Sequence, residues 1–375
     1  MIIGVPKESK IHEYRVGLVP SSVKELTSRG HMVHVEASAG LGAGFADEDY
    51  KAVGAKVLST APDIWKIADL IVKVKEPLSH EYSLMRQEQV LFTYLHLAPD
   101  PQQAEALVRS GNIAIAYETI TNHQGQLPLL APMSEIAGRV SIQAAARSLE
   151  CHQGGAGVLL GGVPGVSPGK VLIIGGGVVG VNAARIAVGM GAHVTVLDLS
   201  LPRLREIDSA FNGRVQTLYS NAHNLEMMLS QADVVVGAVL VPGGAAPKVI
   251  RRHMLSWLKR GTVLVDVAID QGGCFETSRP TTHENPTYEV DGIIHYCVTN
   301  MPGAVAKTSA QALNNATLPF VLALANKGYA KALCDDEHFR NGLNVCCGHI
   351  THPLVAQDLQ MPYVDPMTFL CEGVN

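Results

Sequence analysis

Residues 171–180 read VLIIGGGVVG, an apolar, strand-like run that stops at three glycines. Gly175, Gly177 and Gly180 have the G-x-G-x-x-G spacing of a turn that lets the backbone approach a pyrophosphate and directs a helix N-terminus toward it. A helix-like stretch and a second strand follow, and Asp198 lies at the end of that strand. An acid at this point holds the ribose hydroxyls of NAD and repels the extra phosphate of NADP. We therefore expect a dinucleotide-binding domain with NAD as its cofactor.

Composition and charge restrict the class of protein. The chain has 375 residues and is 47% hydrophobic and 17% charged, which is enough for two domains with real cores. Its net charge of −5 gives no electrostatic reason to expect binding to nucleic acid or to an anionic membrane. The first residues, MIIGVPKES, lack the layout of a signal peptide, and no apolar run is long enough to span a bilayer. We expect a cytoplasmic protein.

The cysteines and histidines give little reason to expect a disulfide or a metal. The seven cysteines are scattered without a C-x-x-C pair, and Cys346 and Cys347 are adjacent, which is poor geometry for a bridge. His349 and His352 are three residues apart and could suggest a metal site, but no second ligand cluster accompanies them. We expect reduced thiols and no metal.

The chain after residue 171 alternates between strand-like and helical stretches. Such alternation implies a parallel, doubly wound sheet with crossover helices. The expected strands are residues 171–175, 193–199, 214–220, 233–240, 262–269 and 292–300. The expected helices are residues 201–211, 222–231 and 250–261, and the proline-containing stretch 278–292 is expected to be a loop.

The N-terminal part of the chain shows a second α/β alternation but no glycine fingerprint, so we expect it to hold the substrate. Two long helical segments, 134–150 and 306–328, flank the nucleotide half, and the second indicates that the tail returns to the first domain. We therefore expect an α/β protein with two Rossmann-like domains. A nucleotide domain of residues 130–302 would be inserted into a discontinuous substrate domain of residues 1–129 and 303–375.

Polar side chains at the ends of strands are the candidates for catalysis, because ligands of open α/β sheets bind at the carboxyl ends of the strands. Lys75, His96 and Asp270 end or nearly end strand-like runs, and Arg15 lies in the loop after the first strand. Arginine offers a fork for a carboxylate, lysine a compact positive charge, and histidine a group that exchanges protons near neutral pH. The set suits a small carboxylate substrate with an oxidisable carbon, whose hydride the cofactor would accept.

Each candidate has an ordinary alternative. Lys75 could be a solvated charge at a strand end, a role for which Lys73 is the better candidate. His96, between two leucines, could be a core histidine, and Asp270 could cap the glycine turn that follows it. Arg15 could be an ordinary loop arginine. It is less satisfactory to apply the ordinary alternative to all four residues at once, because their four separate strand ends or loops all point to one crevice.

The chain resembles bacterial alanine dehydrogenases along nearly all of its length. The segments that carry the resemblance are MIIGVPKE, EYRVGLVP, VKVKEP, FTYLHLAPD, PLLAPMSEIAGR, GGVPGVSPGKVLIIGGGVVGVNAA, VLVDVAIDQGG, VTNMPGAVAKTS and NATLPFVLALANKG. The resemblance implies the NAD-dependent oxidation of L-alanine to pyruvate and ammonia, and the reverse reductive amination. It also implies a homohexamer with a split first domain.

The resemblance further implies residue roles. Arg15 and Lys75 would bind the substrate, His96 would be the acid/base, and Asp270 would assist the carbinolamine chemistry or hold the ribose. As a minor alternative, Arg203 and Arg205 could accommodate the phosphate of NADP. The expected cofactor contacts are Ser134, Gly175, Gly177, Val178, Val179, Gly180, Asp198, Arg203, Ser220, Val239, Leu240, Val267, Ala268, Ile269, Asp270, Arg279, Val298, Thr299, Asn300 and Met301.

Three other functions stay open from the sequence. One is a related dehydrogenase of the saccharopine type, which needs a roomier crevice for a bulkier substrate. Another is the NAD(H)-carrying subunit of a proton-translocating transhydrogenase, which would pass hydride to another protein. The third is a nucleotide-binding protein without turnover. The stretch after Met361 resembles the family least, and we expect it to be peripheral.

Overall fold

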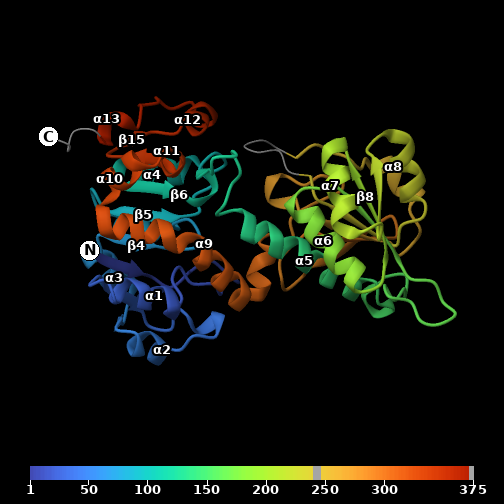
Figure 1. Cartoon of the computed structure of the whole chain (residues 1–375), viewed down its shortest axis with the longest axis horizontal. Helices are drawn as coiled ribbons and strands as arrows, with labels where there is room; N and C mark the ends of the chain where they lie inside the picture. Colours follow the sequence, from blue (N-terminus) through green and yellow to red (C-terminus); the bar gives the residue numbers. More distant parts are fainter. Residues whose placement is uncertain (240–245, 371–375) are drawn as a thin grey trace. The chain divides into compact units, whose positions relative to one another are not determined.

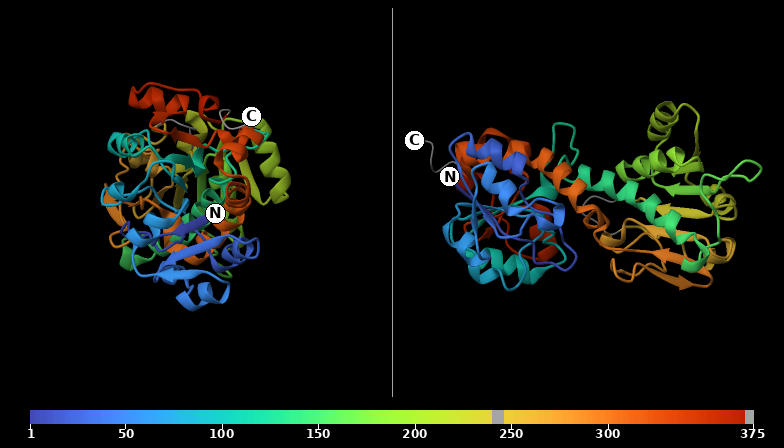
Figure 2. Two further views of the ribbon diagram at one scale, coloured as in Figure 1. Left: turned by 90° about the vertical axis from the view of Figure 1, so that its left-hand side faces the viewer. Right: turned by 90° about the horizontal axis from the view of Figure 1, so that it is seen from below.

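The chain folds around two separate β-sheets, each with its own helices (Figures 1 and 2). The computed structural model describes residues 1–239 and 246–370. Its contacts divide the chain into a first unit, Met1–Met133 with the described chain from Val305 onward, and a second unit, Ser134–Ala304. In Figure 1 the blue N-terminal and the orange-to-red C-terminal segments accordingly belong to one unit.

The first unit contains an eight-stranded sheet with the order β15-β14-β6-β5-β4-β1-β2-β3. Strands β1 to β6 are parallel, and β14 and β15 extend the sheet in antiparallel pairs, so the C-terminal part of the chain completes it. The apolar central strands are buried along their length, as is typical of a parallel sheet covered on both faces. The strands are β1 (Ile2–Val5), β2 (Met32–Glu36), β3 (Lys56–Leu58), β4 (Leu70–Val72), β5 (Val90–Thr93), β6 (Ile113–Ala116), β14 (Leu343–Cys346) and β15 (His349–Ile350).

Several helices of this unit begin where the sequence offers a cap or a proline. Thr60 and Asp100 accept hydrogen bonds from the first turns of α3 and α4, and each of these helices has a proline in its first turn. The helices are α1 (Pro20–Thr27), α2 (Asp47–Ala52), α3 (Ala61–Ile67), α4 (Pro101–Ser110), α9 (Ala306–Lys327), α10 (Tyr329–Asp335), α11 (Glu337–Arg340), α12 (Pro353–Leu359) and α13 (Met367–Leu370).

The second unit contains a seven-stranded sheet with the order β12-β13-β11-β10-β7-β8-β9. All neighbours pair in parallel except β12, which is antiparallel to β13 at the edge. Its strands are β7 (Lys170–Ile174), β8 (His193–Asp198), β9 (Val215–Tyr219), β10 (Val234–Gly237), β11 (Val263–Asp266), β12 (Thr287–Val290) and β13 (Ile293–Tyr296). Its helices are α6 (Val178–Gly189), α7 (Leu201–Phe211) and α8 (Ala222–Leu229), and α5 (Ala131–Ser148) begins just before the unit does.

The prediction of two α/β sheets is confirmed, but one of the expected elements, the loop at 278–292, is wrong. The helical stretch expected at 250–261 is present as a 3₁₀ helix, Arg252–Trp257. Leu255 and Leu258, three residues apart, are both buried, and this spacing suits the three-residue turn.

The expected loop 278–292 contains strand β12. It forms a hairpin with β13 through Asp291 and Gly292, which have φ values of 52° and 80°. Both residues are left-handed, as a two-residue turn of type I′ requires. The Asp-Gly pair was a usable hairpin signal, and the prolines before it led to the wrong prediction.

The stretch after Met361 is not wholly peripheral within its described part. The Val364 amide donates to the Ile350 carbonyl, and Leu370 is buried. Among the described residues, no helix is long and apolar enough to cross a membrane.

Candidate active site

The glycine turn after β7 has one open position. Gly175 has φ 102°, and a Cβ there would lie 2.5 Å from the Ala238 carbonyl oxygen. A Cβ on Gly180 would overlap the Gly175 carbonyl oxygen, so Gly180 lets α6 pack against the turn. A Cβ on Gly177 would meet no atom within 4 Å. The backbone is therefore exposed at Gly177, just before the N-terminus of α6, and this cradle fits a pyrophosphate.

Asp198 and Arg203 hold this turn through the two backbone polar groups of Gly176, its amide and its carbonyl. The Gly176 amide donates to Asp198 Oδ2 at 2.7 Å, and Arg203 Nε donates to the Gly176 carbonyl at 2.6 Å. The Ser200 amide donates to Asp198 Oδ1 at 2.7 Å. Each carboxylate oxygen can accept a further hydrogen bond, so Asp198 can also receive ribose hydroxyls. Arg203 is engaged with Glu206 at 2.6 Å, so a phosphate would have to compete with that carboxylate.

The other expected cofactor contacts lie at the carboxyl edge of the same sheet. The chain reverses its direction of winding between β7 and β10, and ligands bind at such a switch point. Ser220 follows β9, Val239 follows β10, residues 267–270 follow β11 and residues 298–301 follow β13. Leu240 lies outside the described residues.

Ser134 and Arg279, the two remaining expected contacts, lie in other segments of the second unit. Ser134 is one helical turn before Gly138 on α5, and a Cβ on Gly138 would overlap the Val179 carbonyl oxygen at the start of α6. Residues four apart share a helix face, so Ser134 lies on the side of α5 that faces α6. The Arg279 guanidinium lies 4.2 Å from the centre of the Tyr288 ring, in a surface hollow of about 390 Å³.

Asp270 does not end a strand, and within the described part of the chain its side chain makes no capping hydrogen bond to the glycine turn. Strand β11 ends at Asp266, and Asp270 lies exposed in the short 3₁₀ helix Ile269–Gln271. The buried Asp266 holds the turn instead, since it accepts from the amides of Ala268 at 3.1 Å and Cys274 at 2.8 Å. The exposed carboxylate of Asp270 is thus available to a ligand.

Arg15 and Lys75 follow the two strands at the switch point of the first sheet. The chain winds outward through β1, β2 and β3 and then returns to place β4 on the other side of β1. The loop that carries Arg15 packs on the end of β4, because a Cβ on Gly17 would overlap the Val72 carbonyl oxygen. Asn314 of α9 fixes this loop by donating to the Gly17 carbonyl at 3.1 Å and accepting from the Val19 amide at 2.8 Å.

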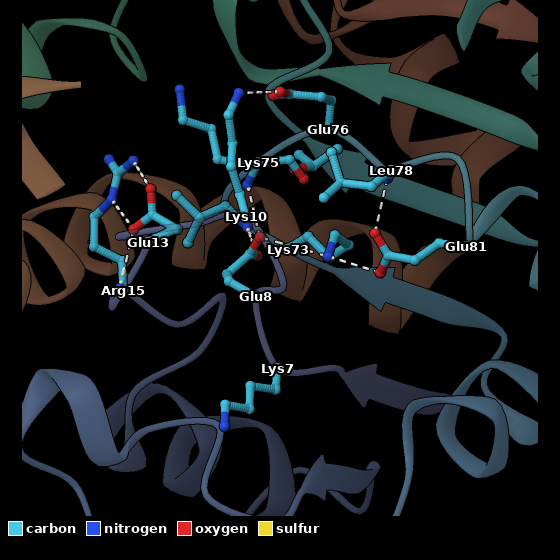
Figure 3. A network of polar contacts seen from close by, with 12 residues as sticks. Lys7, Glu8, Lys10, Glu13, Arg15, Lys73, Lys75, Glu76, Leu78 and Glu81 are labelled. Atoms are coloured by element: carbon cyan, nitrogen blue, oxygen red, sulfur yellow. Dashed lines mark hydrogen bonds and ion pairs between the residues drawn. The ribbon is translucent and has the colours of Figure 1, made fainter. Parts of the chain in front are cut away.

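Arg15 is not an ordinary loop arginine, because it is buried and paired. Its Nε donates to Glu13 Oε1 at 2.7 Å, and its Nη2 lies 2.5 Å from Glu13 Oε2 (Figure 3). Its Nη1 contacts Met133 Sδ at 3.1 Å. Burial opposes the charged form, but Glu13 outweighs this and raises the pKa of Arg15, which keeps the guanidinium charged.

The prediction that Lys73 is a surface lysine is wrong. Lys73 is fully buried, with its Nζ 3.0 Å from Glu81 and 3.4 Å from Glu8 (Figure 3). Two carboxylates from separate loops compensate its charge, and a buried ammonium requires such partners. Lys75, two residues later, is half-buried at the rim of the sheet.

His96 is not a core histidine. Its side chain is 47% exposed, and its backbone is left-handed with φ 49°, which is uncommon for a residue other than glycine. Its ring stacks on Tyr94 with 5.7 Å between the centroids. The His96 amide donates to Glu118 Oε1 at 2.6 Å, and the ring Nδ1 lies 3.9 Å from the same oxygen. The left-handed backbone of His96 is strained, and strained residues are concentrated at functional sites.

Sequence reasoning missed Glu118, Glu8 and Glu13. Glu118 lies two residues after the end of β6, so the strand-end criterion that selected His96 would also have found it. Glu8 and Glu13 lie in a long loop, and no spacing in the sequence relates them to Lys73 or marks them as buried. Within the described parts of the chain, no group of His, Cys, Asp and Glu side chains is arranged to hold a metal ion.

Comparisons with known proteins find one family along nearly the whole chain. The family models described as alanine dehydrogenase/PNT match residues 4–137 with the N-terminal domain and residues 141–353 with the C-terminal domain. The alanine dehydrogenase of Halomonas elongata is 59% identical over 370 residues, which cover 99% of this chain and 100% of that protein.

Two solved structures are also similar. One, described as L-alanine dehydrogenase, has a TM-score of 0.94 and 54% identity, and the match covers 96% of this chain and 99% of that one. The other, a transhydrogenase from Sinorhizobium meliloti, has a TM-score of 0.82 and 25% identity, covering 94% of this chain and 100% of that one.

Proposed function

The chain belongs to the alanine dehydrogenase/PNT family, and on this premise we propose that it is an NAD-dependent L-alanine dehydrogenase. It oxidises L-alanine to pyruvate and ammonia, and it catalyses the reverse reductive amination. The observation that carries the proposal is the placement of Arg15, Lys75 and His96 after β1, β4 and β5, three neighbouring strands, at one edge of a single sheet.

Arg15 and Lys75 fix the substrate. The planar guanidinium of Arg15, oriented by Glu13, binds the carboxylate, and Lys75 lies near the carbon that becomes the carbonyl. The bound nicotinamide supplies the acceptor for the Cα hydride. Alanine must react with its amine neutral, because the nitrogen lone pair forms the C=N bond as the hydride leaves. Fixing this geometry provides a large part of the rate.

His96 handles the protons of the second half of the reaction. Its exposed ring takes a proton from a water that attacks the imine carbon of iminopyruvate, which gives a carbinolamine. His96 then gives this proton to the nitrogen, ammonia leaves, and the hydroxyl proton passes back to His96 as the carbonyl forms. The positive charge of Lys75 stabilises the developing oxyanion. Asp270 assists at the carbinolamine or holds the cofactor ribose.

Consumption of NADH with pyruvate and ammonium, compared with pyruvate alone, tests the proposal. Oxidation that requires ammonium, with L-alanine as product, supports it. Oxidation without ammonium would indicate a 2-hydroxy acid dehydrogenase. The same assay with NADPH tests the role of Asp198, because equal rates with both cofactors would contradict cofactor selection by that acid. A panel of amino acids in the forward direction tests a saccharopine-type alternative.

The similarity to a transhydrogenase structure favours one second candidate, an NAD(H)-carrying protein that transfers hydride to another protein. NADH binding without any turnover of pyruvate and ammonium would support it. The dehydrogenase is favoured because this chain contains all four expected site residues, Arg15, Lys75, His96 and Asp270. We also propose a homohexamer in the cytoplasm, as the family resemblance implies, and light scattering of the purified protein measures the assembly.

A further inference from the structure

Glu8 takes the place of a neighbouring strand beside Lys75. Strands β1 and β4 pair through Ile3 with Leu70 and through Gly4 with Ile71. Beyond it, Glu8 in the loop after β1 accepts the next amides of the β4 segment through its side chain. The Val74 amide donates to Glu8 Oε1 at 2.7 Å, and the Lys75 amide donates to Glu8 Oε2 at 3.4 Å.

Lys75 is therefore held through its backbone from two directions. Glu8 accepts from its amide, and Thr93 Oγ1 donates to its carbonyl at 2.9 Å. Tyr117 donates to the carbonyl of the nearby Lys73 at 3.0 Å. Residues 73–75, the β4 extension, thus reach the rim of the sheet as an ordered segment, although β4 itself ends at Val72.

The charge of Glu8 depends on Lys73. Glu8 is buried, and desolvation raises the pKa of its carboxyl even though Lys73 opposes the effect. Lys73 lies between Glu8 and Glu81 in Figure 3, with its Nζ 3.4 Å from the first and 3.0 Å from the second. Glu81 in turn accepts from the Leu78 amide at 2.9 Å. This bond fixes the far end of the loop that follows β4, residues 73–81. One buried ammonium thus pairs with two carboxylates that each accept from backbone amides.

We propose that Glu8, held by the buried Lys73, is a positioning residue for the substrate-binding Lys75. Glu8 acts through the backbone of the β4 extension and does not touch the substrate. This inference rests on the proposed function, in which Lys75 binds pyruvate or alanine. A purely structural Glu8 would affect the stability of the fold but would have no specific relation to Lys75.

A double-mutant cycle on the full-length enzyme separates these possibilities. The variants are Glu8→Ala, Glu8→Gln, Lys75→Ala and Glu8→Ala with Lys75→Ala. We expect Glu8→Ala to lower kcat/KM for pyruvate by about tenfold or more, because small displacements of a binding group are costly. NADH affinity should stay within about twofold of wild type. Glu8→Gln should recover part of the loss, since its carboxamide oxygen can accept from the Val74 amide.

In the Lys75→Ala background, Glu8→Ala should change kcat/KM by less than about twofold. An equal loss in both backgrounds would overturn the proposal, because Glu8 would then act independently of Lys75. If Lys75→Ala is too slow to assay, calorimetric binding of pyruvate to the enzyme–NADH complex provides the same cycle.

Asp69→Ala is the matched control. Asp69 Oδ2 accepts from the Ile2 amide at 2.7 Å, which is a similar carboxylate bond between the same two strands at their opposite end. The Asp69→Ala variant should therefore have the wild-type kcat/KM for pyruvate. The wild-type rate in the same assay reports on the proposed function. An inactive wild type overturns both proposals, whereas an active wild type with an unchanged Glu8→Ala overturns only the positioning role.

Discussion

Replacing Gly177 and Gly180 separately by alanine distinguishes cofactor binding from packing in the glycine turn. At Gly177 the backbone is extended, with φ −67° and ψ −164°, and a Cβ would meet no protein atom within 4 Å. At Gly180 a Cβ would overlap the Gly175 carbonyl oxygen. The first change therefore affects only a ligand that approaches the turn, whereas the second affects the turn itself.

The structure sets the expected magnitudes. Gly177→Ala loses about 1 kcal/mol as a helix cap and regains a similar amount by restricting the unfolded chain. Its melting temperature should thus stay within about 2–4 °C of wild type. Its Cβ would occupy the approach of the pyrophosphate, and we expect NADH to bind roughly 10–100 times more weakly, or about 1.4–2.7 kcal/mol. Gly180→Ala forces a backbone shift that costs about 1–3 kcal/mol or more and lowers the melting temperature accordingly.

Titration of NADH by fluorescence and thermal melting without ligand measure the two quantities on the same samples. The expected pattern is weak binding with normal stability for Gly177→Ala, and losses of both for Gly180→Ala. Gly177→Ala with wild-type affinity for NADH would refute the assignment of this turn to the pyrophosphate.

The remaining predictions concern the first unit and one buried histidine. Glu118→Ala should lower kcat by about tenfold or more with NADH affinity unchanged, because Glu118 holds the left-handed backbone of His96; Glu118→Gln should retain more activity, and equal rates for both would contradict this role. Lys73→Met should lower the free energy of unfolding in urea by about 3–5 kcal/mol, since two buried carboxylates lose their cation; a loss below about 1 kcal/mol would contradict the buried network. Burial lowers the pKa of His295 from 6.5, so below that pH the unfolded chain binds more protons and stability falls as pH decreases. His295→Gln should make the melting temperature less dependent on pH in that range, and an unchanged dependence would show that other groups control it.

The sequence predicts those parts of the fold that local chemistry determines. The expected helix at 201–211 matches α7 because Ser200 caps it and a proline follows in its first turn. The glycine turn was predicted from three glycines within six residues, and Asp198 from its place at the end of the next strand, β8. The hairpin at Asp291 and Gly292 was equally local, and it was missed only because nearby prolines suggested a loop.

Glu8 could not be predicted in the same way, because no spacing in the sequence relates it to the amides from which it accepts. It accepts from the Val74 amide, 66 residues away, whereas Glu118 could have been found as an acid near the end of a strand. Lys73 and Lys75 differ in burial although they lie two residues apart in one strand-like run. Only the fold, which brings Glu8 and Glu81 to Lys73, makes that difference.

Transfer of deuterium from NADH labelled at nicotinamide C4 tests the proposed reaction most directly. The label is followed by mass spectrometry of the products formed from pyruvate and ammonium. The proposed function predicts one deuterium at Cα of L-alanine, and no labelled product when ammonium is left out. Deuterium in lactate, or in no small-molecule product at all, would contradict it.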